Sequence, residues 1–118
     1  MVHGNKNRTF GRPRNQRTAL IRGLAVSLIR DGKIKTTEAK AKELRPFIER
    51  LVTHGKKNTV AARRIVASRL GEPSAAIMKK VFDDIVPRFG SRAGGYTRVI
   101  KVGRTEAGRD EAVIEFVE

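Results

Sequence analysis

The sequence predicts an α+β fold in which helices form one layer and a small β-sheet forms the other. Apolar residues recur at helical spacing in four segments between residues 15 and 85, whereas residues 97–102 and 112–117 read as strands. A glycine-rich segment, residues 89–96, separates the two kinds of pattern. Because the helices and the sheet each have an apolar face to bury, we expect the two layers to pack against each other.

The first fourteen residues differ in character from the rest of the chain. They contain two glycines, one proline and a single large apolar side chain, Phe10. Such a segment buries too little surface to offset the entropy cost of ordering it. We therefore expect residues 1–14 to be a flexible basic N-terminal extension that orders against a partner, and residues 15–118 to form a single globular domain.

The first predicted helix begins near Asn15 and ends at Asp31-Gly32, because glycine favours helix termination. Its apolar residues recur at helical spacing at Leu20, Ile21, Leu24 and Leu28. A short extended piece, residues 33–36, follows. Thr36 or Thr37 is then in position to cap the next helix.

The second predicted helix spans residues 38–54 and is closed by Gly55. Its expected buried residues are Ala41, Leu44, Ile48, Leu51 and Val52. Pro46 lies inside this helix and removes one backbone donor. We therefore expect a kink or a locally irregular turn there.

The third predicted helix spans residues 59–70, with Gly71 as its stop. The residues expected to point inward are Ala62, Ile65, Val66 and Leu70. Ser74 can cap a fourth helix, whose pattern Pro87 ends. That helix is expected to bury Ile77, Met78, Val81, Phe82 and Ile85.

The two predicted strands are joined by a polar connection, residues 103–111, and are expected to form an antiparallel hairpin. The apolar face of this hairpin is expected to consist of Ile100, Val102, Ile114 and Phe116. We expect the helices to cover that face.

The charge of the chain points to a polyanionic partner. Twenty-six Lys and Arg face twelve Asp and Glu, which gives a net charge of +14 and a pI near 11.3. Self-repulsion of this size destabilises a compact protein unless a polyanion relieves it. The sequence has no run approaching the ~20 apolar residues of a membrane span, no signal-peptide core and no helix pairing a dense basic face with a Trp, Phe and Leu face. Nucleic acid is therefore the expected partner.

The charge is concentrated in two stretches that contain no carboxylate. Residues 1–30 hold seven basic residues and residues 85–105 hold five, so that together they carry +12 of the +14. The middle of the chain instead interleaves signs at helical spacing, as in the pairs Glu38/Lys42 and Arg45/Glu49. Carboxylates are avoided where the backbone of a nucleic acid lies close. The basic residues expected to bind RNA are Lys6, Arg8, Arg12, Arg14, Arg17, Arg22, Arg88, Arg92, Arg98 and Lys101.

The loop around Gly94 and Gly95 is the most informative local feature. Paired glycines permit positive φ and close backbone approach, which can direct N–H groups at a phosphate. Arg92 and Arg98 flank them with planar guanidinium groups that suit phosphate. Tyr96 either stacks on an exposed base or sugar, or packs at the edge of the core with its hydroxyl bonded. Residue type does not decide between these two roles.

No constellation of residues predicts catalysis or a metal site. The two histidines, His3 and His54, are far apart in sequence, and there is no nucleophile motif or Walker-type loop. Asp83 and Asp84 occupy adjacent helix positions and do not face one another. The absence of cysteine excludes disulfides and thiolate zinc sites, and fits a reducing compartment such as the cytoplasm. We expect neither enzymatic activity nor a cofactor.

A DNA-binding helix-turn-helix is the alternative function, since the third and fourth predicted helices have suitable lengths. The fourth helix, however, offers outward Ser74, Ala75, Lys79 and Lys80, with no Arg, Asn or Gln to make bidentate base contacts. Five Phe, one Tyr and no Trp also disfavour a single-strand binder that relies on aromatic stacking. A protein that holds folded RNA by shape and backbone is the favoured interpretation.

Two blocks of sequence carry a family resemblance. They are Ile34-Lys35-Thr36-Thr37 with Lys40-Ala41-Lys42-Glu43-Leu44-Arg45, and Pro87-Arg88-Phe89 with Gly94-Gly95-Tyr96-Thr97-Arg98. With these blocks the chain resembles the bacterial large-subunit ribosomal protein seventeen family over nearly its whole length. Lys35, Thr36, Lys40, Gly94, Gly95 and Tyr96 of these blocks, together with His3, complete the residues expected to bind RNA.

The resemblance implies a structural constituent of the large ribosomal subunit that is not an enzyme. Its implied partners are large-subunit (23S-type) rRNA and neighbouring proteins, among them ribosomal protein thirty-two. Its implied location is the cytoplasm, in the large subunit of a bacterium or a bacterial-type organelle. It also implies a two-layer α/β fold in the order α-β-α-α-α-β-β, in which the early strand joins the C-terminal hairpin in a small three-stranded sheet packed against helices.

Overall fold

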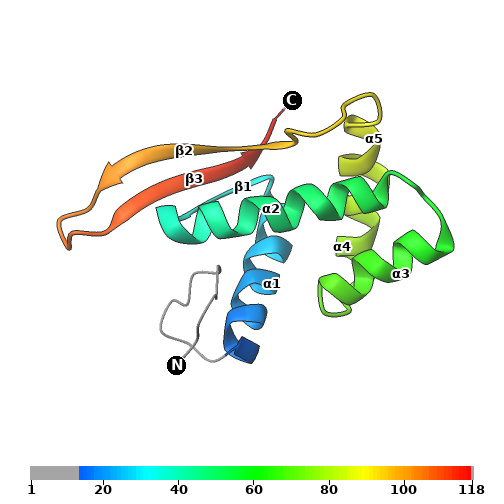
Figure 1. Ribbon diagram of the computed structural model, residues 1–118, viewed down its shortest axis with the longest axis horizontal. Helices are drawn as coiled ribbons and strands as arrows, with labels where there is room; N and C mark the ends of the chain where they lie inside the picture. The colour runs from blue at the N-terminus through cyan, green and yellow to red at the C-terminus, as the bar shows by residue number, and fades with distance from the viewer. Residues whose placement is uncertain (1–13, 118) are drawn as a thin grey trace, which may run out of the picture.

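The structure is a computed structural model that describes residues 14–117. Apart from Arg14, the predicted N-terminal extension lies outside the described residues. The elements follow the predicted order α-β-α-α-α-β-β (Figure 1), which confirms the fold class. They are α1 (Arg14–Asp31), β1 (Lys33–Thr37), α2 (Glu38–Gly55), α3 (Val60–Arg69), α4 (Ala75–Lys80) with its continuation η1 (Val81–Ile85) and α5 (Val86–Arg88), β2 (Thr97–Arg104) and β3 (Asp110–Phe116).

The early strand joins the C-terminal hairpin, as the resemblance implied. The sheet has the order β1-β3-β2, and both pairs of strands are antiparallel. In Figure 1 α2 runs alongside the sheet, the far end of the β2–β3 hairpin extends beyond it on one side, and α3, α4 and α5 gather at the other end. The glycine-rich loop therefore leaves the helical end of the molecule to start β2.

The buried face of the hairpin differs from the prediction at β2. Ile114 and Phe116 are buried as expected, but Ile100 and Val102 are 44% and 54% exposed. The register explains this result, because Val99 lies opposite Ile114 and residues directly opposite one another share a face. The register shifts between Lys101 and Gly103. The prediction for Ile100 and Val102 was therefore wrong, since a shift of one residue exchanges the two faces of a strand.

The hydrophobic core lies between the sheet and the helices, and α2 is its main contributor. The five residues expected to be buried in α2 are all buried, namely Ala41, Leu44, Ile48, Leu51 and Val52. The helix is continuous from Glu38 to Gly55 through Pro46, so of the expected kink or locally irregular turn the irregular turn is absent there. In α3 the buried residues are Ala62 and Val66, while Ile65, predicted to point inward, is 39% exposed because α3 packs along a narrow strip.

Side-chain caps define where the helices begin. The Thr37 hydroxyl, rather than that of Thr36, accepts a hydrogen bond from the Lys40 N–H at the start of α2. Thr59 caps α3 and Ser74 caps α4 in the same way. The fourth helix then widens into a π turn at η1 before it ends at Arg88. Within residues 14–117, no helix combines the length and apolar character that crossing a membrane requires.

Candidate nucleic-acid interface

The glycine-rich loop is held against α2 by a set of hydrogen bonds. The Glu49 carboxylate accepts bonds from the Tyr96 N–H (3.1 Å), the Thr97 N–H (2.8 Å) and the Thr97 hydroxyl (2.7 Å). The Lys56 ammonium and the Tyr96 hydroxyl both donate to the carbonyl of Arg92. These bonds fix the loop on both sides of Gly94, so the segment between Arg92 and Tyr96 is preformed.

The middle of this loop presents unused backbone donors. The N–H groups of residues 93–95 have no hydrogen-bond acceptor within the described part of the chain. Gly94 and Gly95 adopt φ of 144° and 64°, a region that side chains rarely enter. The Arg92 Nε donates to the Gly94 carbonyl at 3.2 Å, which places a guanidinium beside these donors. Successive N–H groups next to a cation are a recognised arrangement for binding an anion.

Tyr96 does not offer a surface for base stacking. Its side chain is 1% exposed and its ring packs against Phe89, with 5.2 Å between ring centroids. Its hydroxyl lies 3.4 Å from the Thr53 hydroxyl and accepts a bond from the Lys56 ammonium at 3.4 Å. Of the two predicted roles, packing at the core edge with a bonded hydroxyl is the one the structure has, and the stacking role was wrong.

The basic residues in the first half of α1 are partly exposed and partly engaged by the fold. Arg14 and Arg22, together with Asn15 and Thr18, line an open hollow of about 550 Å³. Arg22 is half-buried, and its guanidinium donates to the carbonyls of Arg69 (3.1 Å) and Ser68 (3.4 Å), so it caps the C-terminal end of α3. Arg17 is also half-buried, and its Nε has no hydrogen-bond partner within residues 14–117. His3, Lys6, Arg8 and Arg12 lie outside the described residues.

Ion pairs divide the predicted RNA-binding residues into two groups. Four of them face carboxylates, in the pairs Lys35–Glu111 (4.0 Å), Arg88–Asp84 (3.1 Å), Arg98–Glu115 (3.4 Å) and Lys101–Glu38 (3.5 Å). Arg14, Arg17, Arg22, Lys40 and Arg92 have no carboxylate within 4.0 Å among the described residues. The bond from Arg88 lowers the pKa of Asp84, because it favours the charged form of this carboxyl. Among the predicted RNA-binding residues that the structure describes, those without a carboxylate partner therefore lie on α1, at the start of α2 and on the glycine loop.

Thr36 is less suited to contact RNA than Lys35, which precedes it in the sequence. It lies opposite Ala112, which is fully buried, and so points toward the covered face of the sheet. Lys35 has the opposite orientation and is exposed. Of these two motif residues, Lys35 is accordingly the one at the surface.

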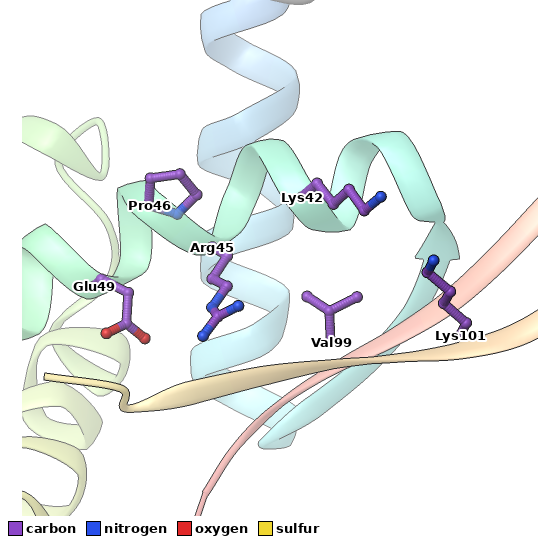
Figure 2. A pocket seen from close by; sticks show the side chains of 6 residues that line it. All are labelled: Lys42, Arg45, Pro46, Glu49, Val99 and Lys101. Carbon is purple, nitrogen blue, oxygen red and sulfur yellow. The ribbon is translucent and has the colours of Figure 1, made fainter.

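An open groove of about 450 Å³ runs between α2 and β2, where Lys42, Arg45, Pro46, Glu49, Val99 and Lys101 line it (Figure 2). Lys42 and Lys101 converge on Glu38, at 2.7 and 3.5 Å, and the bond from Lys42 lowers the pKa of that carboxyl. Arg45 has no carboxylate partner among the described residues, because Glu49 turns instead to the loop. Two of the three cations that line the groove thus face a carboxylate, so the groove is a weaker candidate than the loop.

Glu49 and Lys56 are site residues that sequence reasoning missed. Helical spacing paired Glu38 with Lys42, which the structure confirms, but it also paired Glu49 with Arg45. The partners of Glu49 lie about fifty residues further on, and no local pattern announces such a contact. No group of three or more His, Cys, Asp or Glu side chains within residues 14–117 is placed to hold a metal ion.

Comparison with known proteins identifies the family. The model of the ribosomal protein L17 family matches residues 20–117. The large ribosomal subunit protein bL17 of Persephonella marina is 50% identical over 120 residues, covering 100% of this chain and 96% of the relative. Its counterparts in Thermodesulfovibrio yellowstonii and a Hydrogenobaculum species are 49% and 47% identical, covering 100% of this chain and 88% and 100% of the relatives. The chain therefore belongs to the ribosomal protein L17 family.

Proposed function

We propose that this chain binds large-subunit, 23S-type rRNA through α1 and the glycine-rich loop, by contacts to phosphates rather than to base edges. As a member of the ribosomal protein L17 family it is a structural constituent of the large ribosomal subunit in the cytoplasm, and it is not an enzyme. The observation that carries the proposal is the preformed loop, in which Arg92 stands beside three successive N–H groups that have no acceptor in the part of the chain that the structure describes. Ribosomal protein thirty-two, which the family resemblance implies as a neighbour, is part of the same proposal.

The expected binding mechanism is electrostatic. Each phosphate that a cationic side chain neutralises releases counterions, which contributes about −0.7 to −0.9 to the slope of log affinity against log salt concentration. Backbone N–H groups contribute bonds that do not read sequence. Affinity should therefore fall steeply with salt and should vary little among RNA sequences of the same shape.

The test compares two arginines that carry the same charge. Arg92→Ala removes the cation of the loop, whereas Arg104→Ala removes one that Asp110 already faces at 3.2 Å on the hairpin. Binding to an rRNA fragment is measured over a range of salt concentrations. We expect Arg92→Ala to make the slope shallower by about 0.7–0.9 and Arg104→Ala to change it much less. A wild-type slope near zero, or a loss confined to one RNA sequence, would refute the proposal.

The helix-turn-helix alternative has lost its support. The second helix of that pair is regular over Ala75–Lys80 alone before the π turn begins, which is short for a helix that must lie in a major groove. Membership of the ribosomal protein L17 family also favours the RNA-binding function. A duplex DNA competitor should accordingly displace the rRNA fragment poorly.

A further inference from the structure

A third carboxylate-free stretch occupies residues 50–71. It holds six basic residues and lies between Glu49 and Glu72. It covers the end of α2, the following turn and α3. Each ion pair among residues 14–117 involves a base from elsewhere in the chain, so none of these six has a carboxylate within 4.0 Å there.

This stretch lies between the two parts of the proposed RNA-binding surface. At one end, Lys56 donates to the carbonyl of Arg92 in the glycine loop. At the other end, Ser68 and Arg69 receive the bonds from Arg22 of α1. Figure 1 shows α3 at the helical end of the molecule, away from the tip of the hairpin. The three carboxylate-free stretches are therefore joined through direct contacts.

Some of the six basic side chains already contact other residues of this protein. Arg63 donates to the Asn58 side chain at 3.1 Å and stacks over the Phe82 ring, 4.5 Å from its centroid. Lys57, Arg64 and Arg69 are exposed and have no such partner among the described residues. Because α3 buries Ala62 and Val66, helical geometry places Arg64 on the outward side.

We propose that Lys57, Arg64 and Arg69 form a third contact to the phosphate backbone of folded RNA, continuous with α1 and the glycine loop. This inference rests on the proposed function and adds a surface to it. Charge complementarity selects the ligand, since three cations without acids suit a polyanion. A protein partner fits less well because the cores of protein interfaces are depleted in charged residues, whereas this surface gathers several cations and no acid. The exposed apolar residues of α3, Val60 and Ile65, are flanked by these cations.

The test removes equal charge from two places. One triple variant carries Lys57→Ala, Arg64→Ala and Arg69→Ala; the matched control carries Lys79→Ala, Arg104→Ala and Arg109→Ala, which are exposed residues outside the proposed surface. Binding of the full chain to large-subunit rRNA is measured over a range of salt concentrations, and circular dichroism confirms that both variants fold. We expect the first variant to make the slope shallower by about 2 to 3 and to weaken binding roughly a hundredfold at 0.1 M salt. The control should change the slope by less than one.

The results of these binding assays distinguish a failure of the third contact from a failure of the proposed function. Equal slopes for the two triple variants would overturn the third contact, while a shallower slope for Arg92→Ala would leave the proposed function standing. A wild-type slope near zero would overturn both. If the first triple variant binds rRNA normally but is lost from large subunits, α3 contacts a protein and the inference is wrong.

Discussion

Glu49→Ala should destabilise the glycine loop and weaken RNA binding although it raises the net charge of the chain. The substitution removes the acceptor of three hydrogen bonds, two of them from backbone N–H groups beside the buried side chains of Tyr96 and Thr97. A hydrogen bond to a charged group contributes about 1.5–3 kcal/mol. The three bonds share one carboxylate, so their contributions do not add. We expect the free energy of unfolding to fall by about 2–4 kcal/mol.

The effect on RNA affinity has a sign that distinguishes two explanations. If net charge alone governed binding, loss of a carboxylate would tighten the complex. If the loop must be preformed, the variant has to order it on binding, and affinity should fall by roughly three- to tenfold. Glu106→Ala is the matched control, because it removes the same charge from an exposed position in the hairpin connection.

The measurements are urea unfolding and rRNA-fragment binding at a fixed salt concentration. Glu49→Gln keeps one acceptor oxygen and should lie between wild type and Glu49→Ala in both assays. Tighter binding by Glu49→Ala, matching that of Glu106→Ala, would refute the argument that preformation of the loop matters. A loss of stability below 1 kcal/mol would refute the role assigned to the three hydrogen bonds.

Three further substitutions follow from the same contacts, each measured by urea unfolding with RNA binding as a second readout. Leu44→Ala removes a fully buried side chain and should cost about 2–5 kcal/mol; a cost below 1 kcal/mol would contradict the core described. Tyr96→Phe removes one of the bonds that fix the loop, so it should cost about 1 kcal/mol and lower affinity less than Glu49→Ala does, whereas a larger loss of affinity than that of Glu49→Ala would restore an RNA-contact role. Gly95→Ala meets no atom but needs φ of 64°, so it should cost about 1–2 kcal/mol; a neutral result would argue against this loop conformation.

The fold could be predicted where a periodic pattern acts locally. In α2 the apolar residues recur at helical spacing over the whole helix, and capping residues mark where the helix begins and ends. The five buried residues of α2 therefore follow from their spacing in the sequence. β2 has no such pattern, since Val99, Ile100 and Val102 are all apolar and either alternation is possible. The pairing with β3 and the register shift near Lys101 decide which face is covered. Those are long-range contacts that the sequence of β2 does not contain.

The candidate site could also be predicted only in part from the sequence. The basic character of α1 and of residues 85–105 is visible in the sequence, but the neutralisation of Arg98 and Lys101 by Glu115 and Glu38 is not. These acids come from β3 and the start of α2, and the fold brings them next to β2. A segment without acids can thus face acids from another segment. For this reason the loop at Arg92 remains a stronger candidate than the strand that follows it.

Residues 50–71 illustrate the opposite error, in which averaging hides a local excess of charge. The 67 residues outside the first two stretches carry a net charge of only +2, yet 22 of them hold six bases and no acid. Acids elsewhere in that set, such as Glu38, Asp84 and Glu111, offset the total, but they pair with bases outside residues 50–71. What an RNA phosphate meets is the charge within about a Debye length, ~8–10 Å at physiological salt, not the charge of a long segment. A local excess of charge is therefore visible at the scale of a single helix, and on that scale we propose that α3 contacts RNA together with α1 and the glycine loop.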